Sequence, residues 1–179
     1  MQIPEVDRQM LDELSREELY SYIAMQIRNI WRVDGLYFLG IERRRGTDEA
    51  TEVDAECWRY MGKVEARELK EFLGVSEPDP AGVLRLLRHT SWALSHQLKD
   101  FGVEPDGTAW FTVTECRTQL IRIKKGLGPH PCRQVREGYL VEFARECNPK
   151  VVVECVSCPP DRVREDVWCE WRFKWAEES

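Results

Sequence analysis

The chain has 179 residues, a formal net charge of -6 at pH 7 and 42% hydrophobic residues. This length and composition fit one domain with a real core, and the acidic balance argues against a general nucleic-acid binder. No apolar run is long enough to span a bilayer, and the N-terminus has no signal-peptide pattern. The sequence therefore predicts a cytoplasmic protein that binds neither nucleic acid nor membrane.

Helices are expected in the first half of the chain. Ser15 and Glu18 have the spacing of a capping box, which marks a helix start, and apolar residues then recur at helical spacing. Gly46 and Gly74 are placed to end two of the helices. The expected helices cover residues 15–45, with a break near Gly35, then 47–74 and about 81–101.

The hydrophobic period changes near Thr108, where alternation of two replaces the helical period. Such an order predicts an α+β fold, in which the N-terminal helices pack on an antiparallel sheet that carries one further helix. We expect a single domain, 1–179, with a helical region (1–103) and a cysteine-rich α+β region (104–179). The expected strands are 108–116, 120–124, 151–156 and 168–175, and the expected later helix is 132–147.

Six of the seven cysteines lie in the last third of the chain. Cys155 and Cys158 have the spacing with which two thiolates grip one tetrahedral ion. Zinc is the favoured ion, and an iron–sulfur cluster is the alternative because a proline follows Cys158. A bound ion would also hold the loop 157–166, which has little else to hold it; otherwise the thiols act as small buried hydrophobic groups. Two further ligands would come from Cys116, Cys132 and Cys169.

Cys132 also suggests a nucleophile. It begins a helix, where exposed N–H groups favour a thiolate. His130 would act as its base, and Asp161 would orient that base. The alternative is that Cys132 only starts the helix and that His130 is a solvated loop residue.

Four carboxylates fall in the helical half, three of them on apolar stripes, where a charge must be paired, protonated or bound to a cation. They are either an acid/base or metal-binding set, or buried partners of Arg28, Arg59 or Arg67. His89 and His96 are expected at the surface or at an interface. The four carboxylates are Asp34, Glu42, Asp54 and Glu65.

Two sets of residues resemble known families. The C-terminal half resembles the 4-vinyl-reductase domain, a small-molecule-binding module related to ligand-binding domains of nitric-oxide signalling and Golgi-transport proteins. The N-terminal helices are similar to the L-2-amino-thiazoline-4-carboxylate hydrolase-like families. The first resemblance is carried by Cys132, Gly138-Tyr139-Leu140, Glu154-Cys155 and 166–173, and the second by 34–38, Glu42, Asp54, Trp58 and 65–67.

The first resemblance implies a small-molecule ligand between the helices and the aromatic face of the sheet. The second implies a hydrolase that opens a C–N or C–S bond of a small ring, by Cys132 with His130 and Asp161 or by a metal-activated water. The apolar helical stripes are also consistent with a homodimer. The expected ligand-binding residues are Trp110, Tyr139, Phe143, Trp171 and Phe173.

Overall fold

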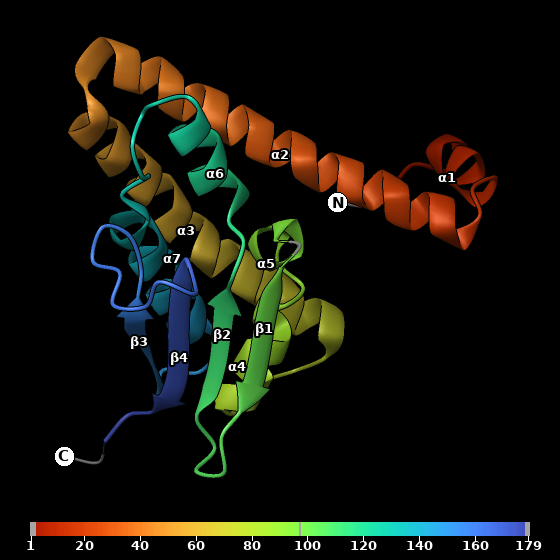
Figure 1. Ribbon diagram of the computed structural model, residues 1–179. Coiled ribbons are helices and arrows are strands. Elements are labelled where there is room, and N and C mark those ends of the chain that lie inside the picture. The colour runs from red at the N-terminus through yellow and green to blue at the C-terminus, as the bar shows by residue number, and fades with distance from the viewer. Residues whose placement is uncertain (1–2, 97, 178–179) are drawn as a thin grey trace.

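The computed structural model describes residues 3–96 and 98–177, in which seven helices accompany one four-stranded antiparallel sheet (Figure 1). This arrangement confirms the expected α+β class. The elements are α1 (Glu5–Asp12), α2 (Arg16–Arg45), α3 (Thr47–Leu73), α4 (Pro80–Leu87), α5 (Ser91–Ser95), β1 (Lys99–Val103), β2 (Ala109–Val113), α6 (Arg117–Lys124), α7 (Cys132–Cys147), β3 (Val151–Ser157) and β4 (Cys169–Trp175).

The sheet has the strand order β1-β2-β4-β3. Phe111 lies opposite Trp171 across the β2–β4 pair, and Phe173 lies opposite Val153 across the β3–β4 pair. Because side chains alternate along a strand, these residues share the face that the helices cover, and Phe111, Trp171 and Phe173 are fully buried there. The expected alternation of β4 is therefore confirmed.

Helices α3 and α7 pack along each other behind the sheet and form the main interface of the helical layer (Figure 1). Their backbones approach closely at Gly62, where a Cβ atom would lie 2.4 Å from the carbonyl oxygen of Tyr139. Leu140 and Phe143 of α7 fill the space between this helix pair and the strands. The position of α7 places its first residue, Cys132, beside the loop that follows β3.

The ends of the two long helices follow the sequence signals. The Ser15 hydroxyl accepts a hydrogen bond from the Glu18 N–H, and the Glu18 carboxylate accepts one from the Ser15 N–H, which completes the capping box. Gly74 ends α3 in the left-handed conformation that glycine adopts without strain. Helix α2 runs unbroken through Gly35, so the expected break there was wrong.

Two segment predictions were wrong. The expected helix 81–101 is divided, because the Thr90 side chain caps a new helix at the Ala93 N–H and Lys99 already pairs with Val113 in the sheet. The expected strand 120–124 belongs to helix α6. Both edges of β2 are occupied by β1 and β4, so this short segment cannot pair with β2. Among the described residues, no helix is both long and apolar enough to cross a membrane.

Candidate functional site

Four cysteines meet where α7 begins and the β3–β4 loop passes it. Cys155 lies near the end of β3, Cys158 follows that strand, and Cys169 begins β4. The Arg133 N–H donates a 2.8 Å hydrogen bond to the Pro159 carbonyl, which fixes the start of α7 against the loop. Cys132, the first residue of α7, is thereby brought to Cys158.

The thiol of Cys158 is central to this thiol cluster, defined as Cys132, Cys155, Cys158 and Cys169. Hydrogen bonds with the three other thiols raise the pKa of Cys158 far above its usual range. The same contacts lower the pKa of Cys132 and of Cys155. All four thiols are free. As the side chains are placed, residues 3–96 and 98–177 contain no His, Cys, Asp or Glu group arranged to hold a metal ion.

The remaining cysteines differ from the cluster. Cys116 is buried directly before α6. Its burial chiefly, and the nearby Cys132 and Cys169 to a smaller extent, raise the pKa of Cys116 to about 12. Burial likewise raises the pKa of Cys147 to about 12 at the other end of α7. Cys57 is exposed on α3. Cys116 is thus a neighbour of the cluster, whereas Cys57 and Cys147 lie elsewhere.

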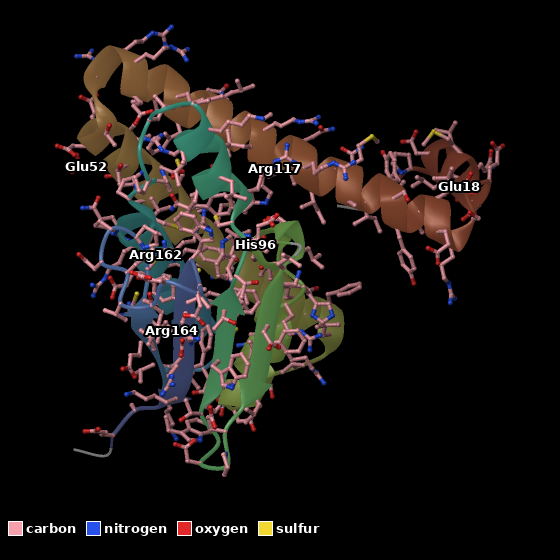
Figure 2. All side chains as sticks on the ribbon, in the orientation of Figure 1. Glu18, Glu52, His96, Arg117, Arg162 and Arg164 are labelled. Atoms are coloured by element: carbon pink, nitrogen blue, oxygen red, sulfur yellow. The ribbon has the colours of Figure 1, made fainter. Side chains whose placement is uncertain are left out.

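The loop between β3 and β4 is held by its own side chains, which corrects the expectation that it has little to hold it. The Arg162 guanidinium donates 2.8 Å hydrogen bonds to the carbonyls of Glu165 and Val167 and lies 4.4 Å from the centre of the Trp168 ring. Arg164 pairs with Glu170, which is buried. Figure 2 shows both arginines on this loop.

A buried arginine lies next to the thiol cluster. Arg136 is only 4% exposed, and its guanidinium carbon lies 4.3 Å from the Trp58 ring centre and 5.0 Å from that of Trp31. Its hydrogen bond with Cys132 helps to lower the pKa of that thiol, while its Nη1 has no hydrogen-bond partner among the described residues. Arg136 therefore links the thiols to the helical layer, and cations over aromatic faces are stabilised there.

Three of the four singled-out carboxylates surround this arginine. Asp34 accepts a 3.0 Å hydrogen bond from the Trp58 indole, and Glu65 accepts a 2.7 Å one from the Tyr139 hydroxyl. Burial chiefly raises the pKa of both Asp34 and Glu65. Asp54 lies beside Asp34, and burial together with the Asp34 charge raises the Asp54 pKa to about 7. This pair can share one proton near neutral pH.

The expected arginine partners of the carboxylates were wrong. Glu42 lies apart from the other three carboxylates and binds Arg122 through two hydrogen bonds, which lower the pKa of Glu42. Arg67 instead binds Glu146 on α7. Arg136 and Arg122 come from the second half of the chain, so no local spacing rule could identify them.

The expected nucleophile set is only partly assembled. His130 is buried and its Nε2 lies 3.8 Å from Asp54 Oδ2, while Asp161 pairs with Arg133 at 3.2 Å. Asp161 therefore does not orient His130, which corrects that prediction; Asp54 is the nearby carboxylate. Burial chiefly lowers the pKa of His130 to about 3, so its ring is neutral at pH 7. Nor is His130 a solvated loop residue.

The aromatic residues predicted to bind a ligand lie mainly in the packed core. Tyr139, Phe143, Trp171 and Phe173 are fully buried and line neither of two surface hollows, one over α7 and β3 and one beside α6. Trp110 packs over Gly102 on the opposite face of the sheet. The prediction that Trp110 lines one pocket with the other four aromatic residues was therefore wrong. The larger hollow measures about 340 Å³ and is lined by Ile123, Pro129, His130, Pro131, Pro159, Pro160, Arg162 and Trp168.

Sequence reasoning missed Arg136 and misplaced His96. Arg136 falls between Val135 and Tyr139 on the buried stripe of α7, and a charge on an apolar stripe is the signal that identified the carboxylates. His96 is 8% exposed, beside Trp92, and both its ring nitrogens lack partners among the described residues. His96 therefore lies in the packed interior, so its expected position at the surface or at an interface was wrong.

Comparison with known protein families gives a match over most of the chain. Residues 12–175 match the sequence profile of a family described as a family of unknown function (DUF6125). No curated protein and no solved structure matches the chain.

Proposed function

Because this chain belongs to a family of unknown function, we propose its function from its geometry: it is a metal-binding protein that holds one ion through the thiol cluster. The observation that carries the proposal is the contact of the Cys158 thiol with three other thiols. Those thiols come from β3, β4 and α7, so the fold itself gathers them. Four thiolates are a complete ligand set for tetrahedral zinc.

The thiols must turn from one another onto the ion for this to occur. A cysteine sulfur is placed by a single side-chain torsion, and a strained rotamer costs about 0.5–1.5 kcal/mol. Structural zinc in small peptides contributes about 10–16 kcal/mol at pH 7. The gain exceeds the cost of four such adjustments, and the lowered pKa values of Cys132 and Cys155 favour the thiolate form that metals require.

Zinc is preferred to an iron–sulfur cluster because four sulfurs close around one ion in the smallest space. One feature supports the iron–sulfur alternative: a proline directly follows Cys158, as in many iron–sulfur ligand motifs. Cys116 is the reserve ligand, since it lies near Cys132 and Cys169 but keeps its proton more firmly. In this arrangement Cys132 is a ligand, so it is not a free nucleophile.

The test is elemental analysis of protein purified without chelators, together with native mass spectrometry. We expect one zinc per chain in the wild type and in the matched controls Cys57→Ser and Cys147→Ser. The double variant Cys155→Ser with Cys158→Ser should lose the metal. If this variant does not fold, the wild type is treated instead with a mercurial thiol reagent, which should displace the metal from the thiols. Less than about a tenth of an equivalent of any transition metal in the wild type overturns the proposal.

We further propose that the hollow beside the thiol cluster binds a small molecule. It lies between α6 and the loops that carry His130 and Pro159, and its lining is largely apolar with two polar groups, His130 and Arg162. This role agrees with the expected similarity to the 4-vinyl-reductase type of ligand-binding domain. It replaces the sheet face as the ligand site, because the aromatic residues there are packed.

A hydrolase is the second candidate, favoured by one observation: His130 lines the hollow with Asp54 directly behind it at 3.8 Å. A proton could pass between these groups during ring opening by water once substrate binding brings them within hydrogen-bond distance. L-2-amino-thiazoline-4-carboxylate is the probe that separates the two functions. Turnover that is lost in Asp54→Asn supports the hydrolase, saturable binding without turnover supports the binding module, and no binding contradicts both.

A further inference from the structure

Helix α2 extends far beyond the body of the protein. Its 30 residues correspond to about 45 Å, and only the later half packs on α3 and α5 (Figure 1). Trp31, which bonds Ser91 and stacks on Trp58, is where the body contacts begin. Glu18 lies at the far end, next to α1 (Figure 2). A helix that stands alone in water is marginally stable. The arm formed by α1 and the first half of α2, residues 5–30, therefore needs a partner.

Helix α2 carries an apolar stripe that the body does not cover. Its members recur at alternating spacings of three and four residues, the pattern of a coiled-coil seam. Ile23, Ile30 and Tyr37 occupy one seam position and are 44%, 50% and 72% exposed. Trp31, Asp34 and Phe38, which contact the body, lie on an adjacent face of the helix. The seam consists of Leu19, Ile23, Gln26, Ile30, Val33, Tyr37 and Gly40.

The charges of α2 indicate what covers this seam. Its first turn is acidic, with Glu17 and Glu18, and its last turn is basic, with Arg43, Arg44 and Arg45. Two copies of α2 laid antiparallel bring the acidic end of each beside the basic end of the other, and they also oppose their helix dipoles favourably. A parallel pair would place like charges together at both ends.

The charge of the arm also argues against a membrane surface. From residue 5 to residue 30 the acidic residues Glu5, Asp7, Asp12, Glu13, Glu17 and Glu18 outnumber the basic residues Arg8, Arg16 and Arg28 by six to three, which gives a net charge of -3. Anionic bilayers attract basic amphipathic helices, not acidic ones. A second copy of the chain satisfies both the apolar seam and the end charges.

We propose that two copies of this protein associate through α2, with the helices antiparallel and the two-fold axis close to Ile30. The seam of each copy then packs against the seam of the other along α2. Gly40 supports a close approach, because nothing lies within 4 Å of the position of its missing Cβ atom. This interface is independent of the thiol cluster and of the hollow.

Light scattering coupled to size exclusion, over a range of protein concentrations, tests the association in the full chain. We expect a dimer for the wild type. Ile30→Glu, which places two charges at the axis, should raise the dissociation constant at least about 100-fold and give a monomer. The matched control is Met25→Glu, since Met25 is 39% exposed on the same arm but off the seam. A monomeric wild type, or equal loss in both variants, overturns the proposal.

Cross-linking tests the orientation, in a Cys57→Ser background that removes the exposed native thiol. Ile30→Cys should form an intermolecular disulfide, because the two copies of residue 30 meet at the axis. Leu19→Cys should not, because the two copies of residue 19 would be about 33 Å apart and a disulfide needs Cα atoms within about 7 Å. Efficient cross-linking through residue 19 would show a parallel pair and overturn the antiparallel arrangement.

Discussion

The guanidinium of Arg122 forms two parallel hydrogen bonds with the carboxylate of Glu42, Nη2 lying 2.8 Å from Oε1 and Nη1 3.0 Å from Oε2. The two side chains are only 7% and 13% exposed, so this pair joins α6 to α2 out of contact with most solvent. Arg122 also donates to the Gly128 and Leu127 carbonyls of the loop before α7. The pair therefore positions the segment that leads to His130 and Cys132.

Removing one partner of this pair should be costly. Arg122→Ala leaves the Glu42 charge buried without its partner, and we expect a loss of about 3–5 kcal/mol in the free energy of unfolding. The control is Arg145→Ala, which breaks an ion pair with Glu142 in which Arg145 is 65% exposed, and should cost less than about 1 kcal/mol. Urea denaturation measures both. Equal costs would contradict the role of the pair.

The contact between α3 and α7 depends on the absence of a side chain at position 62. Gly62→Ala places a Cβ atom 2.4 Å from the Tyr139 carbonyl oxygen, so the helices must move apart. We expect a loss of about 1–3 kcal/mol. Gly35→Ala is the matched control, because nothing lies within 4 Å of its Cβ position, and it should stabilise α2 by up to about 1 kcal/mol. Thermal unfolding distinguishes the two, and similar shifts in both would refute the close approach.

The Tyr139 hydroxyl should contribute through Glu65. Tyr139→Phe removes the donor that lies 2.7 Å from Glu65 Oε2 and leaves that partly buried oxygen without it. We expect a loss of about 1–3 kcal/mol, since an unsatisfied buried group keeps its desolvation cost. Tyr60→Phe removes a hydroxyl from a residue that is 69% exposed and should have no measurable effect. Chemical denaturation of both variants checks the prediction; a neutral Tyr139→Phe would show that Glu65 does not need this donor.

Asp54 should make stability depend on pH. Its pKa is raised from 3.8 to about 7, so between these values the folded state holds a proton that the unfolded state has released. The free energy of unfolding therefore falls as pH rises through this window, by at most about 4 kcal/mol. Asp34 on α2, Arg136 on α7 and a hydrogen bond with Trp58 on α3 shape the shift. His130 on the loop also faces this carboxyl, its Nε2 lying 3.8 Å from Oδ2.

The test is the difference between the wild type and Asp54→Asn, because His130 acts in the opposite direction. Its lowered pKa makes stability rise with pH below its ordinary value of 6.5. Subtracting the two pH profiles, measured by denaturation from pH 4 to pH 8 or so, removes most of the histidine effect. Profiles that run parallel would show that Asp54 does not titrate in this window.

Local signals in the sequence determined much of the helical layer and most strands. Ser15 with Glu18 and the glycine at 74 mark helix ends through bonds between near neighbours, and alternation from 169 to 175 marks a strand with one buried face. One of the two segments that failed lacked such a signal. Residues 120–124 are a short stretch, Leu-Ile-Arg-Ile-Lys, that fits either period, and only the occupied edges of β2 decide against a strand.

The candidate site shows the same division more sharply. Composition and spacing singled out Cys155 with Cys158 and the three carboxylates on apolar stripes, because burying a thiol pair or a charge is unusual wherever the chain folds. Tertiary structure decides which groups pair with these thiols and carboxylates. Arg136 lies 82 residues from Asp54 in sequence. Cys132 meets Cys158 only because the Arg133 N–H bonds to the Pro159 carbonyl. A sequence shows that a buried charge needs a partner, but only the packing of α7 against α3 selects that partner.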